Sequence, residues 1–160
     1  MTELTTQLAA RLTSLRWMMT IAESCTGGMM AARCTDLPGS SRWFERGFVT
    51  YSNAAKIELL GVNPQHIADE GAVSEAVARA MALGAVYRTP ARVSVAVTGI
   101  AGPDGASAAK PVGTVWFAWC MDGLVSAEVK HFGGDRQSVR EATTMWGLQG
   151  LLERLPRPGP

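Results

Sequence analysis

Three side chains near the middle of the sequence could form a nucleophile with its base. Lys56 follows Tyr51 closely, and Ser41 stands a little earlier, in the stretch GSSRWFERGFVTYSNAAK. A lysine can act as a general base when burial or a nearby cation lowers its pKa toward neutrality. A serine becomes nucleophilic when such a base accepts its proton, and a tyrosine hydroxyl can relay that proton. The alternative interpretation is a capped helix that carries a solvated lysine.

Cys25 is a second candidate nucleophile. It precedes two glycines where a helix is expected to begin, a position that can favour a thiolate. The alternative is a small packed thiol, which is the more common role of an isolated cysteine. The two histidines, His66 and His131, lack metal-ligand spacing with Cys, Asp or Glu, so we expect neither a metal nor another cofactor.

Two glycine-rich segments could bind a ligand. In AESCTGG, the amides of Thr26, Gly27 and Gly28 would lie at a helix N-terminus, where anions bind, although a tight strand-to-helix turn explains the glycines equally well. No Gly-Lys-Ser/Thr follows, so the segment is not a P-loop, and it lacks the G-x-G-x-x-G of dinucleotide-binding folds. The second segment, 98–114, is longer than most connections and follows a strand, which favours a functional loop.

Hydrophobic periodicity and turn residues predict alternating helices and strands. This interleaving, with one hairpin at Asp122-Gly123, predicts an α/β fold: a three-layer α/β/α sandwich around a mixed, mostly parallel sheet. The expected strands cover 16–22, 47–52, 92–99, 113–120 and 124–132, and the expected helices cover 3–15, 29–37, 53–61, 74–88 and 135–155.

Composition narrows the class of protein. The chain has 160 residues, 47% of them hydrophobic, and a net charge of +1. We therefore expect one globular domain, 1–160, with an ordered core over about 5–155 and a frayed tail at 156–160. The small net charge disfavours nucleic acid as a partner. With no apolar run of membrane-spanning length, no secretory signal and scattered cysteines, we expect a cytoplasmic protein without a membrane partner.

Four blocks in a fixed order resemble the CinA C-terminal domain family, also labelled competence/damage-inducible proteins. The blocks are AESCTGGMMAARCTDLPGSSRWFERGFVTYSNAAKIELLGV, GAVSEAVARAMALGA, VAVTGIAGPDG and KPVGTVWFAW. They extend over most of the chain, from about residue 5 to 150, and are most similar to the stand-alone nicotinamide mononucleotide amidohydrolases of the PncC type.

The resemblance implies a fold like that of anticodon-binding domains and a homodimer as a possible assembly. It implies a hydrolase that removes the carboxamide nitrogen of nicotinamide mononucleotide, giving nicotinate mononucleotide and ammonia in pyridine nucleotide recycling. By motif position it assigns the catalytic serine, tyrosine and lysine to Ser41, Tyr51 and Lys56. The substrate-binding residues that it implies are Glu23, Ser24, Thr26, Gly27, Gly28, Gly39, Ser40, Thr98, Gly99, Ala101, Gly102 and Gly105.

On this interpretation Thr26 to Gly28 would hold the phosphate, and Glu23 would contact the ribose or the cationic ring. Backbone amides near 39–41 or in the 98–105 loop would stabilise the oxyanion. Two other functions stay open: a regulatory nucleotide-binding module without catalysis, and a Tyr–Lys oxidoreductase. The missing G-x-G-x-x-G argues against the oxidoreductase.

Overall fold

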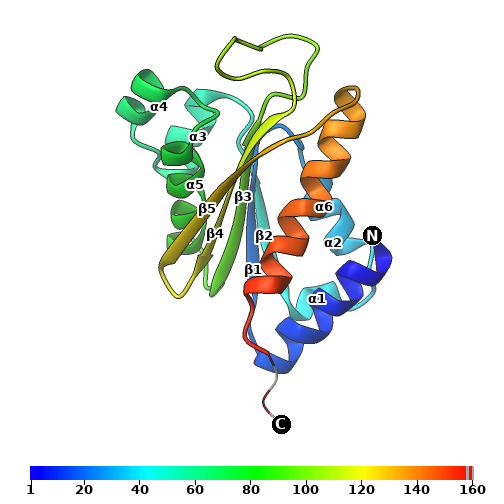
Figure 1. Cartoon of the computed structure of the whole chain (residues 1–160). Helices are drawn as coiled ribbons and strands as arrows, with labels where there is room; N and C mark the ends of the chain where they lie inside the picture. Colours follow the sequence, from blue (N-terminus) through cyan, green and yellow to red (C-terminus); the bar gives the residue numbers. More distant parts are fainter. Residues whose placement is uncertain (158, 160) are drawn as a thin grey trace.

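The computed structural model describes residues 1–157 and 159, and it has the layered arrangement expected from the sequence (Figure 1). The expected frayed tail, 156–160, therefore lies partly outside the described residues. The strands are β1 (Met19–Glu23), β2 (Phe44–Val49), β3 (Val93–Gly99), β4 (Thr114–Met121) and β5 (Leu124–His131). The helices are α1 (Thr2–Leu15), α2 (Met29–Thr35), α3 (Asn53–Leu60), α4 (Pro64–Glu70), α5 (Glu75–Tyr87) and α6 (Arg136–Arg154), with a short 3₁₀ helix, η1, at Ser40–Arg42.

Within the described residues, the strands form one five-stranded sheet in the order β2-β1-β3-β4-β5. The pairs β1/β2 and β1/β3 are parallel, whereas β3/β4 and β4/β5 are antiparallel. The mixed sheet is thus confirmed: β1, β2, β3 and β5 run in one direction, and β4 alone runs in the opposite direction. The antiparallel half follows from the Asp122-Gly123 hairpin and from the return of β4 beside β3.

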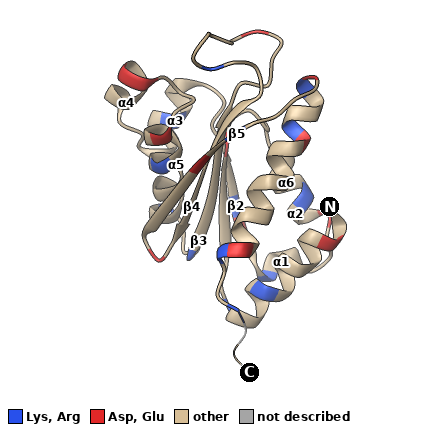
Figure 2. Ribbon diagram, in the orientation of Figure 1, with Lys and Arg blue, Asp and Glu red and all other residues tan. Residues whose placement is uncertain are grey.

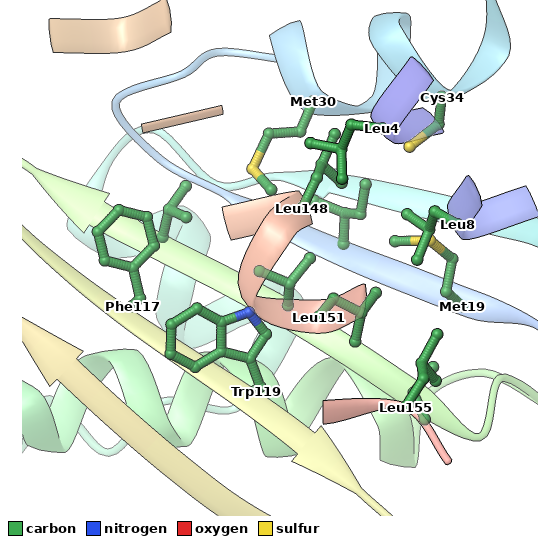
Figure 3. Packing of buried hydrophobic residues seen from close by; sticks show 14 of the residues in the cluster. Leu4, Leu8, Met19, Met30, Cys34, Phe117, Trp119, Leu148, Leu151 and Leu155 are labelled. Atoms are coloured by element: carbon green, nitrogen blue, oxygen red, sulfur yellow. The ribbon is translucent and has the colours of Figure 1, made fainter. Parts of the chain in front are cut away.

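Side chains alternate between the two faces of the sheet and build a core on each. From β3, Val93, Val95 and Val97 face α1, α2 and α6, while Ala96 faces α3 and α5. The first face carries the bulky residues shown in Figure 3, where Phe117 and Trp119 of β4 lie against Leu148 and Leu151 of α6. Figure 1 shows α1, α2 and α6 on this side of the sheet and α3, α4 and α5 on the other.

The second core uses small residues, which bring α5 close to the sheet. Ala78, Ala82 and Ala85 of α5 pack with Ala96 and Ala118 of the strands. This close packing also places α3 against α5, and α3 is the helix that carries Lys56.

The ends of the helices show which local signals were correct. Ser74 caps α5, Ser52 caps α3 and Gly61 ends α3, which agrees with the helices expected over 74–88 and 53–61. The first strand begins at Met19, later than expected, because Arg16 adopts a left-handed conformation that ends α1. Helix α4, with Asn63 as its cap and Pro64 at its start, was not anticipated.

Candidate active site

A pocket of about 250 Å³ lies at the carboxyl ends of β1, β2 and β3. Because these three strands run in parallel, the segments that follow them meet at one edge of the sheet, the usual place for ligand sites in α/β folds. The pocket is lined by the turn after β1, the start of α3, the segment before α5, the loop after β3 and the start of α6.

Ser24 and Lys56 are in contact at this pocket. Lys56 Nζ lies 2.9 Å from Ser24 Oγ, and both residues are buried and line the pocket. Lys56 Nζ also donates to the backbone carbonyls of Thr50 at 2.9 Å and Tyr51 at 3.2 Å. The carbonyls of Thr50 and Tyr51 directly follow β2, and Ser24 directly follows the neighbouring strand β1. The end of β2 therefore holds the Lys56 amine against Ser24.

Lys56 has the environment of a general base. Its side chain is only 1% exposed, and burial lowers its pKa below the ordinary value of 10.5. A neutral amine has two N–H groups and one lone pair. In this neutral form the carbonyls of Thr50 and Tyr51 can accept the two N–H groups, and the lone pair can accept the hydroxyl proton of Ser24. The contact can therefore carry the proton of Ser24 to Lys56.

Ser41 lies elsewhere, and its expected pairing with Lys56 is wrong. Ser41 is exposed on η1, before β2 begins, whereas Lys56 follows the end of β2. The six residues of β2 rise about 3.3 Å each and so separate the two by roughly 20 Å. Gly39 lies at the same distant edge, beside a groove along α1, and Ser40 shares η1 with Ser41. The amides near 39–41 are therefore excluded as oxyanion donors for this pocket.

Glu23 and the turn after Ser24 also differ from the expectation. Glu23 is fully buried, and its carboxylate accepts hydrogen bonds from the Thr26 hydroxyl and from the amides of Gly28 and Met30. The start of α2 thus already holds an anion, supplied by the protein itself. Thr26, Gly27 and Gly28 lie outside the pocket lining, so the expected phosphate site on these residues and the ribose contact of Glu23 are both wrong.

Tyr51 contacts an arginine that sequence reasoning missed. The Tyr51 hydroxyl accepts a hydrogen bond from Arg136 Nη2 at 2.9 Å, and Arg136 Nη1 donates to the Gly102 carbonyl at 2.8 Å. Tyr51 is 59% exposed and lines the pocket, and Lys56 contacts its backbone carbonyl, whereas its hydroxyl pairs with Arg136. Arg136 is the first residue of α6, where a positive charge is disfavoured by the helix dipole. That misplaced charge was the available sequence signal for Arg136.

The loop after β3 lines the opposite wall of the pocket. The Thr98 hydroxyl donates to the Ala72 carbonyl at 2.9 Å, which ties the end of β3 to the segment before α5. The loop is held farther out by Lys110, which donates to the Glu70 carbonyl at the end of α4. Asp104 supplies the only carboxylate among the residues that line the pocket in the described part of the chain. All five residues predicted here line it: Thr98, Gly99, Ala101, Gly102 and Gly105.

Cys25 borders the same pocket but is a poor nucleophile. It is 5% exposed, and burial raises its pKa to about 11, which disfavours the reactive thiolate. Cys25, Cys34 and Cys120 are all free and buried. Residues 1–157 and 159 contain no group of three or more His, Cys, Asp or Glu side chains placed to hold a metal ion. Among the same residues, no helix is long and apolar enough to cross a membrane.

Comparison with known proteins identifies the family of the chain. The model of the CinA C-terminal domain matches residues 1–155. The chain belongs to the CinA C-terminal domain family. Among its CinA relatives, the nicotinamide-nucleotide amidohydrolase PncC of Enterobacter agglomerans is 53% identical over 151 residues, which cover 94% of this chain and 92% of that protein.

Two further members show how closely sequence and fold are shared. The nicotinamide-nucleotide amidohydrolase PncC of Pseudomonas putida is 51% identical over 95% of both chains. The crystal structure of the competence/damage inducible protein CihA from Agrobacterium tumefaciens superposes with a TM-score of 0.93. It is 44% identical and covers 95% of this chain and 93% of its own. The α/β architecture is therefore that of solved CinA proteins.

Proposed function

We propose that this protein is a nicotinamide-nucleotide amidohydrolase, which converts nicotinamide mononucleotide and water to nicotinate mononucleotide and ammonia in NAD recycling. Relatives named for this activity match nearly the whole chain at 51–53% identity. The structural observation that carries the proposal is the contact between Ser24 and Lys56 in the pocket at the edge of the sheet. A hydroxyl nucleophile with a buried amine as its base is suited to cleaving a carboxamide.

In the first half of the reaction, neutral Lys56 accepts the proton of Ser24 while Oγ attacks the carboxamide carbon. The C–O bond forms and the carbonyl becomes a tetrahedral oxyanion. The amide of Cys25 directly follows the nucleophile at a strand-to-helix turn, which makes it the candidate oxyanion donor. Lys56 then returns its proton to the nitrogen, the C–N bond breaks, and ammonia leaves behind an ester on Ser24.

In the second half, water attacks the ester carbon and gives one proton to Lys56. The bond to Ser24 breaks, Oγ takes the proton back from Lys56, and the carboxylic acid is released. Lys56 is thus neutral at the start and at the end, as a base with a lowered pKa requires. All of these proton transfers use a single pair of side chains, which are already in contact.

The charges around the pocket suggest how the nucleotide is oriented. Glu23 occupies the start of α2, so the substrate phosphate needs another donor. Arg136 lines the pocket and can replace its contact with Tyr51 by a phosphate contact. Asp104 lines the pocket and is the candidate partner of the cationic pyridinium ring. The binding roles of Thr98, Gly99, Ala101, Gly102 and Gly105 stay part of this proposal, as do a homodimer and a cytoplasmic location.

The experiment is an ammonia assay on purified protein with nicotinamide mononucleotide, comparing Ser24→Ala with Ser41→Ala. Ser24→Ala should lower kcat by at least about a thousandfold, as loss of a nucleophile does in other serine hydrolases. Ser41→Ala should keep nearly the full rate, because Ser41 is exposed at the other end of the sheet. An inactive Ser41→Ala beside an active Ser24→Ala would refute the assignment. A wild-type protein that binds the nucleotide but releases no ammonia would indicate the regulatory module instead.

A further inference from the structure

Glu23 carries a buried negative charge that the catalytic steps above do not use. Its side chain is 0% exposed. Oε1 accepts hydrogen bonds from the Thr26 hydroxyl at 2.6 Å, the Gly28 amide at 3.2 Å and the Met30 amide at 2.9 Å, and Oε2 accepts one from the Ala31 amide at 3.0 Å. Among the described residues Glu23 forms no salt bridge, so its direct partners are these four hydrogen-bond donors.

The position of Glu23 connects this charge to both reacting groups. Glu23 is the last residue of β1 and directly precedes Ser24. Its carboxylate holds the turn that follows Ser24. Its backbone carbonyl accepts hydrogen bonds from the Thr50 amide at 2.8 Å and the Thr50 hydroxyl at 3.3 Å. Thr50 in turn offers its own carbonyl to Lys56 Nζ at 2.9 Å. Glu23 therefore contacts both the turn that follows Ser24 and Thr50, the residue whose carbonyl binds Lys56.

The same turn is held from its other side by α6. Arg140 Nε donates to the Cys25 carbonyl at 3.1 Å, and Arg140 Nη2 donates to the Thr26 carbonyl at 3.0 Å. The turn thus lies between a buried carboxylate that binds its amides and a guanidinium that binds its carbonyls. Such a turn has little freedom to move Ser24 away from Lys56.

If Glu23 served only to pack the end of β1, its buried carboxylate would lower the stability of the fold. A charge removed from water lowers stability unless hydrogen bonds compensate it fully, and an apolar residue would avoid that cost. We infer that Glu23 is a positioning residue, which orients the turn so that Ser24 Oγ lies against Lys56 Nζ. This inference rests on the proposed function, because it assigns Glu23 to the supports of that same site.

Thr26→Val is the cleanest test, because valine keeps the shape of threonine and removes only the 2.6 Å hydrogen bond to Glu23. We expect kcat for nicotinamide mononucleotide to fall about tenfold, the effect of losing one hydrogen bond to a charged group. KM should stay within about twofold, because Thr26 lies outside the pocket lining. The pH at half-maximal rate should not move, because Lys56 keeps its surroundings.

Glu23→Gln extends the test, because a glutamine keeps the size but loses the charge and one of the acceptor oxygens. We expect a larger fall in kcat, about a hundredfold, again with little change in KM. Ser94→Ala is the control for general loss of stability. It removes a buried hydrogen bond from Ser94 to the Ala82 carbonyl, at the beginning of β3 and away from the pocket. Its kcat per folded molecule should equal that of the wild type.

The outcomes separate this inference from the proposed function. Thr26→Val with the wild-type kcat would overturn the positioning role, even if Glu23→Gln failed to fold. A rise in KM with constant kcat would overturn it as well, since that result would make the turn a binding element. If wild-type protein released no ammonia, or if Ser24→Ala stayed active, the proposed function itself would fail.

Discussion

At the scale of single residues, the site depends on where one lysine is buried. Lys56 is among the largest fully buried side chains, yet it begins close to the exposed N-terminus of α3. Its long side chain runs inward and ends among carbonyls and Ser24. Burial of this kind disfavours the charged form and lowers the pKa of Lys56, so the amine is more readily neutral, and more readily a base, than an exposed lysine.

Lys56→Arg should therefore be nearly as inactive as Lys56→Ala, because an arginine keeps the positive charge but cannot lose its proton. The wild-type rate should also depend on pH in a defined direction. Below the lowered pKa of Lys56 the amine is protonated and cannot accept the proton of Ser24, so kcat should rise with pH through that pKa and then level off. The measurement is kcat against pH for the wild type. Substantial activity in Lys56→Arg would show that Lys56 is only an electrostatic anchor.

Local and distant contacts differ in how far the sequence predicted them. Tyr51 and Lys56 are near neighbours in sequence, and their placement at the end of β2 followed from local signals. The contact between Ser24 and Lys56 joins residues 32 positions apart and exists only because β1 and β2 are parallel. Motif position assigned the nucleophile to Ser41, but the direction of β2 places Ser41 and Lys56 at opposite ends of the same strand. Strand direction was the missing information.

At the scale of elements, caps and turns were predictable, whereas partners across the pocket were not. Ser74, Gly61 and the Asp122-Gly123 turn each have a local reason for their conformation, and the hairpin at Asp122-Gly123 lies where it was expected. The contacts of the Glu23 carboxylate depend on tertiary structure. It accepts hydrogen bonds from amides at the start of α2 that an external anion could otherwise have bound. Sequence analysis offered these amides as an anion site or as a plain turn, and it did not anticipate that the Glu23 carboxylate accepts their hydrogen bonds.

The contact of α5 with α3 gives a test at this scale. A Cβ atom on Gly84 of α5 would lie 2.0 Å from the Leu60 carbonyl oxygen at the end of α3. Gly84→Ala must therefore push α3 and α5 apart, and overpacking of this kind costs about 1–3 kcal/mol of folding free energy. Because α3 carries Lys56, kcat should fall together with stability. Urea unfolding and the ammonia assay measure the two effects.

Gly133→Ala is the matched control for this substitution, because nothing lies within 4 Å of the added Cβ. It should leave both stability and kcat close to the wild-type values. If Gly84→Ala lowered stability without changing kcat, then the position of Lys56 would not depend on the packing of α3 against α5.

At the scale of the whole molecule, the pocket joins both helical layers. Lys56 comes from α3 on one face of the sheet, and Arg136 comes from α6 on the other, so the carboxyl edge of the sheet is where the two layers meet. Figure 2 shows charged residues mainly on helices and loops, with little charge along the central strands. With a net charge of +1, the protein has no broad positive field to attract a nucleotide. Recognition of the phosphate must therefore rely on a local cation.

Arg136 is the local cation that this arrangement provides, and its role can be tested by changing the substrate as well as the protein. Arg136→Gln should raise KM for nicotinamide mononucleotide about 10–100-fold, because a charge-assisted hydrogen bond contributes about 1.5–3 kcal/mol. Nicotinamide riboside lacks the phosphate, so its kcat/KM should be low in the wild type and nearly unchanged by the substitution. Arg92→Gln is the control, because Arg92 pairs with Asp122 at the opposite end of β3 and should affect neither substrate. Equal losses for the mononucleotide and the riboside would mean that Arg136 serves only to hold Tyr51 and Gly102 together, and that the phosphate is bound elsewhere.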